Sequence, residues 1–313
     1  MTSYRHRLPQ LGGSFFLTDG GIETTLIFHQ GLNLPLFASY VLLDDPAGRE
    51  ALKCYYRDYL KFAEERGIGF VLESPTWRCS RDWGAKLGHD GRRIEAFNRE
   101  AIELMEELRR EARTGIPIVI SGNIGPRGDG YAPEAQLGPD EAEAYHSHQI
   151  RTFADTAADM VAAVTMTHTG EAIGVVRASR SAGMPVAIAF TTETDGRLPS
   201  GEALGEAIEK VDEATGAAPA YYMVNCAHPD HFAGALGEGT WRARIRGIRA
   251  NASRKSHAEL DNSDVLDPGD PVELGQDYKR LRRMLPQLSV FGGCCGTDHR
   301  HIEQICLSCL EAA

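Results

Sequence analysis

Two adjacent cysteines, Cys294 and Cys295, stand among glycines in residues 291–296, which read FGGCCG. A third cysteine, Cys226, follows another apolar run, AYYMVN, earlier in the chain. Adjacent cysteines are poor disulfide partners for each other, whereas thiolate sulfur is a preferred ligand of zinc. Three protein ligands leave one tetrahedral position of zinc open, which is typical of catalytic sites. The three cysteines therefore predict a zinc site that can accept a substrate.

These cysteines could instead have a purely structural role. Cysteine is often a small buried apolar residue, but flanking glycines offer little packing to Cys294 and Cys295. Alternatively, this pair could form a closed four-sulfur structural site with Cys306 and Cys309. Those two cysteines stand three residues apart on an expected helix, where they share one face and can belong to the core. The seven cysteines of this long chain are an odd number, which indicates a reducing compartment rather than a disulfide framework.

The elements that must position these thiols alternate along the chain. Short apolar, β-branched segments are followed by turns and then by helix-like segments, such as residues 49–67, 92–115 and 139–158. The expected strands are residues 15–19, 68–74, 116–122, 159–166, 184–191, 220–226, 244–251 and 288–293. The seventh is the weakest, because arginines interrupt it. Eight such units predict an α/β fold, a (β/α)8 TIM-type barrel that forms one domain over residues 1–313.

In such a barrel, active sites lie where the strands end at their carboxyl side. The polar and aromatic side chains expected there, besides the cysteines, are Asp19, Glu73, Thr76, Trp77 and Asn225. Cys226 follows the sixth strand and the adjacent pair follows the eighth, so only one strand separates them. Neighbouring strands lie about 4.8 Å apart, so short loops can bring the three thiols together on one rim.

Composition restricts the partners of the protein. The formal charge is −11 at pH 7 and the isoelectric point is near 5.5, so the surface repels nucleic acid and anionic membranes. No apolar stretch approaches the roughly 20 residues needed to span a bilayer, and the N-terminal residues do not form a secretory signal. We therefore expect a cytoplasmic protein with small-molecule partners. The sequence gives no indication of its oligomeric state.

Several motifs together resemble one known family. They are LTDGGIETTL at residues 17–26, SGNIGP at 121–126, VNCAHP at 224–229 and GGCCGT followed by DHRHI at 292–302. Along nearly the whole chain, the sequence resembles the zinc-dependent homocysteine S-methyltransferases, including the S-methylmethionine- and betaine-dependent enzymes. It is also similar to the homocysteine-binding module of cobalamin-dependent methionine synthase.

The resemblance implies a (β/α)8 barrel that binds Zn2+ through Cys226, Cys294 and Cys295, with Asp19 contacting the substrate amine. The implied reaction moves a methyl group from a sulfonium or ammonium donor to the thiol of homocysteine, giving methionine in methionine biosynthesis. Zinc deprotonates the acceptor thiol, which makes it a nucleophile. S-methylmethionine, S-adenosylmethionine and betaine all remain possible donors.

Aromatic and histidine side chains near the strand ends are further candidates. Trp77 and either Tyr221 or Tyr222 could offer aromatic faces to a cationic donor, although core packing is the commoner role of such residues. His228 could be a fourth ligand or a proton carrier, although a histidine in such a loop more often caps it.

The chain departs from the family on two strands. Where the family has a glutamate that binds the amino group of homocysteine, at the end of the fourth strand, this chain has Val164. Glu73 on the second strand is the expected compensation. The family's turn after the seventh strand is replaced by RANASRKSH. Two alternatives to homocysteine methylation therefore stay open: the same alkyl transfer to a different thiol, or a barrel that binds zinc or thiols without catalysis.

Overall fold

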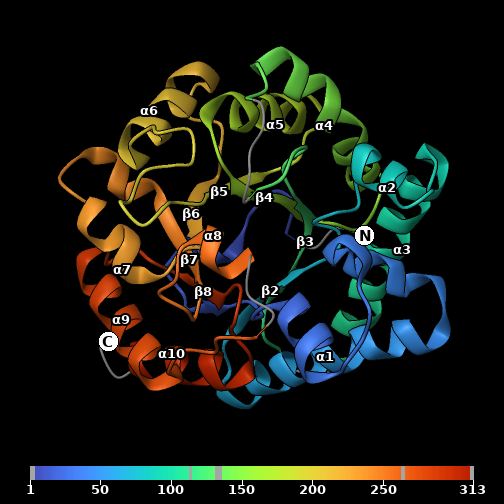
Figure 1. The fold of residues 1–313 in the computed structure, drawn as a ribbon, viewed down its shortest axis with the longest axis horizontal. Coiled ribbons are helices and arrows are strands. Elements are labelled where there is room, and N and C mark those ends of the chain that lie inside the picture. The colour runs from blue at the N-terminus through green and yellow to red at the C-terminus, as the bar shows by residue number, and fades with distance from the viewer. Residues whose placement is uncertain (1–3, 113–114, 131–135, 262–264, 311–313) are drawn as a thin grey trace.

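The computed structural model describes residues 4–112, 115–130, 136–261 and 265–310. Within them, eight parallel strands pair in chain order and β1 pairs with β8, which closes a barrel (Figure 1). The strands are β1 (Phe16–Leu17), β2 (Gly69–Glu73), β3 (Ile118–Ile124), β4 (Met160–Met166), β5 (Val186–Phe190), β6 (Tyr221–Asn225), β7 (Ile245–Ala250) and β8 (Val290–Gly293). The predicted (β/α)8 barrel is confirmed, including the strand that arginines interrupt.

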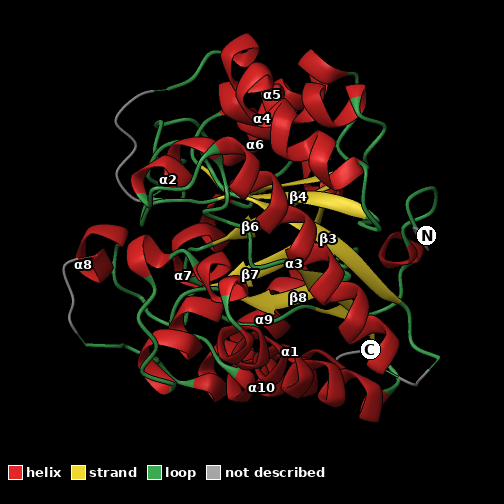
Figure 2. Cartoon of the chain, turned by 90° about the vertical axis from the view of Figure 1, so that its right-hand side faces the viewer, coloured by secondary structure: helices red, strands yellow, loops and turns green. Residues whose placement is uncertain are grey.

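Helices surround the strands on the outside of the barrel (Figure 2). They are α1 (Pro46–Arg66), α2 (Arg81–Lys86), α3 (Gly91–Glu111), α4 (Pro139–Ala154), α5 (Thr169–Ser181), α6 (Leu204–Thr215), α7 (Pro229–Phe232), α8 (His257–Asp261), α9 (Pro271–Met284) and α10 (His299–Leu310). Local signals fix their ends: in α1, the Asp45 side chain accepts hydrogen bonds from the Ala47 and Gly48 amides. Gly67 then ends this helix with a φ of 64°. No helix among the described residues is both long and apolar enough to cross a membrane.

Two apolar layers stabilise the barrel. The larger lies between the strands and the surrounding helices, and a smaller cluster fills the barrel interior. The N-terminal segment lies against the amino ends of the strands, where the Tyr4 amide donates to Asp159 Oδ1 at 2.8 Å and the Arg5 side chain donates to the Ala158 carbonyl. Because this segment covers that end, the carboxyl ends of the strands are the open end of the barrel interior.

Candidate metal centre and substrate cleft

Three cysteines converge at the carboxyl ends of β6 and β8. The sulfur atoms of Cys226, Cys294 and Cys295 all lie within 4.8 Å of one another. The Cys226 and Cys295 sulfurs are 3.5 Å apart. Cys226 is buried, whereas Cys294 and Cys295 are partly exposed. The structure thus brings together the three thiols that the sequence placed on one rim.

Backbone hydrogen bonds to β7 hold these thiols in place. The Cys226 amide donates to the Arg249 carbonyl at 3.0 Å, and the Cys294 amide donates to the Ala250 carbonyl at 2.9 Å. The strand between β6 and β8 therefore fixes both sides of the cluster. Cys226 itself adopts a φ of 56°, a left-handed conformation that is uncommon outside glycine.

The glycines of the cysteine loop meet a steric requirement. A Cβ atom at Gly293 would collide with the Thr297 side chain, and Gly296 has a φ of +80°. The Thr297 hydroxyl donates to the Cys294 carbonyl at 2.7 Å, and the Thr24 hydroxyl accepts from the Gly296 amide at 2.9 Å. The GGCCGT sequence thus forms a tight turn that only small residues permit.

The donor set fits zinc. Sulfur ligands at about 2.3 Å around a tetrahedral ion are separated by about 3.8 Å, close to the spacing of these three thiols. Hydrogen bonds from Cys226 and Cys295 stabilise the Cys294 thiolate and lower the pKa of Cys294. Hydrogen bonds to Cys294 and Cys295, with burial, raise the pKa of Cys226. The protein therefore already favours negative charge on sulfur where a cation would bind.

The other metal-binding candidates lie elsewhere. His228 Nδ1 accepts from the Asp230 amide at 3.1 Å and so caps α7. It belongs to a separate group with Asp230 and Asp277, which arginines neutralise. Cys306 and Cys309 are buried in the core on α10. The described residues therefore do not form the closed four-sulfur site.

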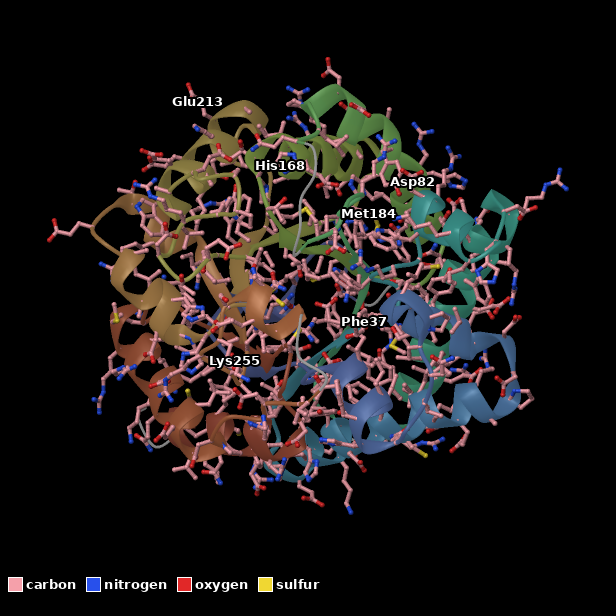
Figure 3. The ribbon with its side chains drawn as sticks, viewed as in Figure 1. Phe37, Asp82, His168, Met184, Glu213 and Lys255 are labelled. Atoms are coloured by element: carbon pink, nitrogen blue, oxygen red, sulfur yellow. The ribbon has the colours of Figure 1, made fainter. Side chains whose placement is uncertain are left out.

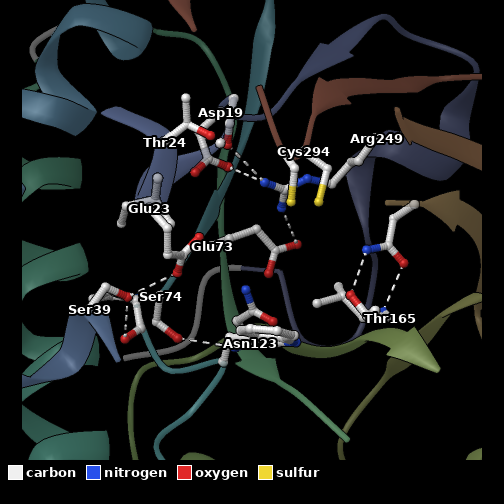
Figure 4. Close-up of a pocket in the computed structure, with 18 of the residues that line it drawn as sticks. Asp19, Glu23, Thr24, Ser39, Glu73, Ser74, Asn123, Thr165, Arg249 and Cys294 are labelled. Carbon is white, nitrogen blue, oxygen red and sulfur yellow. Dashed lines mark hydrogen bonds and ion pairs between the residues drawn. The ribbon is translucent and has the colours of Figure 1, made fainter. Parts of the chain in front are cut away.

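A cleft of about 660 Å³ opens beside Cys294 and Cys295 (Figure 4). Its charged and polar lining comes from several strand ends: Asp19, Glu23, Thr24, Ser39, Glu73, Ser74, Asn123, Thr165, Asn225 and Arg249. Both Cys294 and Cys295 form part of its wall, so a thiol bound in the cleft can reach the cysteine cluster. The cleft thus joins an end formed by the cysteine cluster to a strongly charged end.

Arg249 is the central charge of this cleft. It is buried, and its Nη2 donates to Asp19 Oδ1 at 2.8 Å, while its Nε donates to the Gly293 carbonyl at 3.2 Å. Burial opposes its charge, but the carboxylates of Asp19 and Glu73 raise the pKa of Arg249. Asp19 has other partners, since its Oδ2 accepts from the Tyr55 hydroxyl at 2.8 Å. Asp19 therefore faces the cleft with both oxygens already hydrogen-bonded.

Two glutamates line the same cleft. Glu73, at the end of β2, is 3% exposed, and its Oε1 lies 4.0 Å from Arg249 Nη1. Burial, which Arg249 only partly offsets, raises the pKa of Glu73 to about 7. Glu23 is half-buried in the cleft wall, where burial likewise raises its pKa to about 7. Both carboxyls therefore change charge near neutral pH.

The position of the absent family glutamate is filled by apolar surface. Val164 lines the cleft from β4 and is buried. The next residue, Thr165, has a φ of 61° and is held by Asn225. The Asn225 Oδ1 accepts from the Thr165 amide at 2.8 Å, and its Nδ2 donates to the Thr165 hydroxyl at 2.9 Å. Asn225 thus joins the ends of β4 and β6, and because it also lines the cleft, its contact with the substrate stays a prediction.

Of the remaining predicted residues, one lines the cleft and the others are buried. Trp77 lines the cleft, with the Arg78 guanidinium 4.2 Å from the centroid of its ring. Thr76 is fully buried and donates to the Asn123 carbonyl at 2.7 Å, so it supports the wall without lining it. Tyr221 and Tyr222 are buried in the core. Of these aromatic candidates, Trp77 is the one that a donor in the cleft can contact.

A second, more apolar cleft adjoins the first. It has a volume of about 930 Å³ and shares Glu23, Thr24, Trp77 and Cys295 with the charged cleft. Its other lining residues are Phe28, Phe37, Ser253, His257, Leu260, Val265, Leu266, Asp267 and Gly296. Figure 3 labels Phe37, which lines this cleft, and Lys255, which stands in the chain between the lining residues Ser253 and His257. The two clefts therefore meet at Cys295.

Sequence reasoning missed Arg249, Glu23 and Asn123. The signal for Arg249 was present, because a charged residue within an expected strand must find a polar partner. Glu23 follows Asp19 closely in the DGGIE segment, which already carried the family resemblance. Asn123 lies in the SGNIGP motif at the end of β3, which also carried the family resemblance.

Comparisons with known proteins agree with this architecture. The family model for homocysteine S-methyltransferase matches residues 16–309. Three structures of the homocysteine methyltransferase MmuM from Escherichia coli are similar at 17% identity. The oxidized form has a TM-score of 0.74 over 94% of this chain and 95% of that one. The metallated form has 0.73 over 93% and 95%, and the apo form has 0.66 over 94% and 96%.

At this identity, the structural likeness establishes the fold alone. No curated protein matches the chain. The family assignment therefore depends on the family model, which covers most of the sequence. The chain belongs to the homocysteine S-methyltransferase family.

Proposed function

We propose that this methyltransferase binds Zn2+ through Cys226, Cys294 and Cys295 and methylates the thiol of homocysteine to give methionine. The observation that carries the proposal is the cluster of three sulfurs within 4.8 Å, two of which form the wall of a polar cleft. Three thiolates give zinc one open position. When bound, zinc would hold the acceptor sulfur as a thiolate, which is a far better nucleophile than a thiol at neutral pH.

The residues of the two clefts orient the reactants. The acceptor lies in the charged cleft, and a cationic methyl donor lies in the apolar cleft that meets it at Cys295. Glu23 and Trp77 border both clefts and can stabilise the positive charge of the donor. Alignment of donor and thiol supplies much of the rate. The donor leaves as a neutral sulfide or amine, so the step needs no acid.

The first experiment titrates zinc-loaded protein with L-homocysteine by calorimetry, in two buffers of different ionisation enthalpy. We expect saturable binding with release of about one proton, because a thiol of pKa about 8.5 must be deprotonated to bind as thiolate. Turnover is then measured as methionine formed from S-methylmethionine, S-adenosylmethionine or betaine. If protein of confirmed zinc content bound no homocysteine, the proposed acceptor would be wrong.

Val164 and Asp19 favour a second candidate, the same alkyl transfer to another thiol. Val164 cannot pair with an ammonium, and both oxygens of Asp19 already have partners. A thiol without an amino group would need neither residue. The same titration with simple thiols, followed by turnover, distinguishes the two acceptors.

A further inference from the structure

Two opposite charges lie side by side in the wall of the acceptor cleft. Arg249 reaches it from β7 and Glu73 from β2, with Arg249 Nη1 4.0 Å from Glu73 Oε1 (Figure 4). This distance is too long for a hydrogen bond. Both side chains are buried, with Arg249 8% and Glu73 3% exposed. Elsewhere in the cleft, Arg249 makes a closer contact with Asp19, at 2.8 Å.

Each of the two groups has unused hydrogen-bonding capacity. The Nε and Nη2 of Arg249 donate to Gly293, Asp19 and Gly20, whereas Nη1 has only the 4.0 Å contact with Glu73 among the described residues. Glu73 Oε2 is buried without a hydrogen bond of normal geometry within that part of the chain. Buried polar groups without partners are costly. A ligand that supplies both partners would therefore be favoured.

An α-amino acid carries the two charges that match this pair. Its carboxylate and ammonium are attached to one carbon, so they present opposite charges a few ångströms apart. We propose that Arg249 and Glu73 together bind the α-amino-acid head of the acceptor thiol, with its carboxylate on Arg249 Nη1 and its ammonium on Glu73 Oε2. This inference depends on the proposed function, because it assigns the head group of the same acceptor.

The rest of the cleft supports this assignment. Val164 offers no charge on β4, and Asp19 serves as the counterion that orients the Arg249 guanidinium. Arg249 Nε donates at 3.2 Å to the carbonyl of Gly293, the residue before Cys294, and Cys294 lines the same cleft. A head group held at Arg249 therefore leaves the thiol end directed toward the cysteine cluster. Asp19 is then a positioning residue.

The test compares three acceptors that differ only in their head groups. L-homocysteine has both charges, 4-mercaptobutyrate lacks the ammonium, and 3-mercaptopropylamine lacks the carboxylate. Each is titrated by calorimetry into zinc-loaded protein carrying Arg249→Met, Glu73→Gln or the control Arg246→Met. Arg246 lies at the other end of β7 and donates to the Gln287 carbonyl.

We expect a crossed pattern of affinities. Arg249→Met should weaken homocysteine and 4-mercaptobutyrate about 10- to 100-fold, the effect of a charge-assisted hydrogen bond, and change 3-mercaptopropylamine less than about 3-fold. Glu73→Gln should weaken homocysteine and 3-mercaptopropylamine and spare 4-mercaptobutyrate. The control should leave all three unchanged. If Arg249→Met does not fold, Arg249→Lys keeps a cation beside Asp19 and should preserve the preference for carboxylate-bearing thiols.

Two results would overturn the inference, and they have different consequences for the proposed function. If both variants weakened all three thiols equally, the pair would be structural and the proposed function would stand. If zinc-loaded wild-type protein bound none of the thiols, the proposed acceptor site would fail together with the head-group assignment.

Discussion

The two ends of the charged cleft are built in different ways. At the thiol end, backbone hydrogen bonds to β7 fix Cys226 and Cys294. At the charged end, side chains hold one another, and the Asp19–Arg249 pair joins residues 230 positions apart. The thiol end matches the motif that carries the family resemblance, whereas the charged end has Val164 where the resemblance predicts a glutamate. Main-chain hydrogen bonds thus fix the thiol end, and contacts between side chains fix the charged end.

The largest effect should come from breaking the thiol end. We expect Cys226→Ser to remove bound zinc and to reduce turnover by on the order of 10³-fold or more, because the acceptor would remain a protonated thiol. Metal content and methionine formation measure the two losses. Cys309→Ala, in the buried core of α10, should retain both. A Cys226→Ser protein with full zinc and full turnover would show that the cluster is not the catalytic centre.

The next effect concerns the pH dependence of stability, which Glu73 at the charged end controls. The pKa of Glu73 is raised from 4.5 to about 7 in the folded protein, so the folded state binds more protons than the unfolded state between these values. Its contribution to the free energy of unfolding therefore falls as the pH rises from about 4.5 to 7, by about 3 kcal/mol. We expect Glu73→Gln to remove this fall. Between pH 5 and 8, the free energy of unfolding of the variant should therefore rise by about 3 kcal/mol relative to that of the wild type.

Urea unfolding at several pH values measures this difference, with the exposed Glu65→Gln as the control. Identical pH profiles for wild type and Glu73→Gln would mean that Glu73 is ionised in the folded protein throughout this range.

A smaller effect is expected from Asn225, which precedes Cys226 in the chain and bonds to Thr165. Asn225→Ala should leave the buried Thr165 amide without its partner, which costs about 1–3 kcal/mol of stability. Because Cys226 is the next residue, we also expect zinc affinity to fall about 10-fold, as for other residues that support metal ligands. Asn225→Asp retains an acceptor for the Thr165 amide and should recover part of both losses. Chelator competition measures the zinc affinity. An unchanged affinity would show that Asn225 does not support the metal centre.

The smallest effect should be at the donor side. Arg78 already covers part of the Trp77 ring, so a donor cation gains less there than at a free aromatic face. We expect Trp77→Ala to raise the KM for the donor about 5-fold and to leave homocysteine binding nearly unchanged, with Trp77→Phe in between. Steady-state kinetics with each substrate varied in turn measures the two effects. A larger effect on homocysteine would place Trp77 in the acceptor site instead.

The strand that was hardest to predict proved central to the site. Residues 244–251 were the weakest expected strand because arginines interrupt the apolar pattern, yet β7 carries Arg249 into the cleft and holds the cysteines. Conversely, Thr76 and Asn225 stand at strand ends as expected, but the Thr76 side chain bonds to β3 and the Asn225 side chain bonds to β4, two strands away. The position of a residue at a strand end can be predicted from the sequence, whereas the hydrogen-bond partner of its side chain cannot.

The barrel and the meeting of the three thiols could be predicted from the sequence. Apolar periodicity and helix ends are local signals, and in a closed barrel the sixth and eighth strands must flank the seventh. The position of Arg249 between Asp19 and Glu73, and that of Val164 in the wall of the same cleft, became evident from the folded structure. Those relations depend on strand register and on side-chain direction between residues far apart in the chain, which no local pattern encodes.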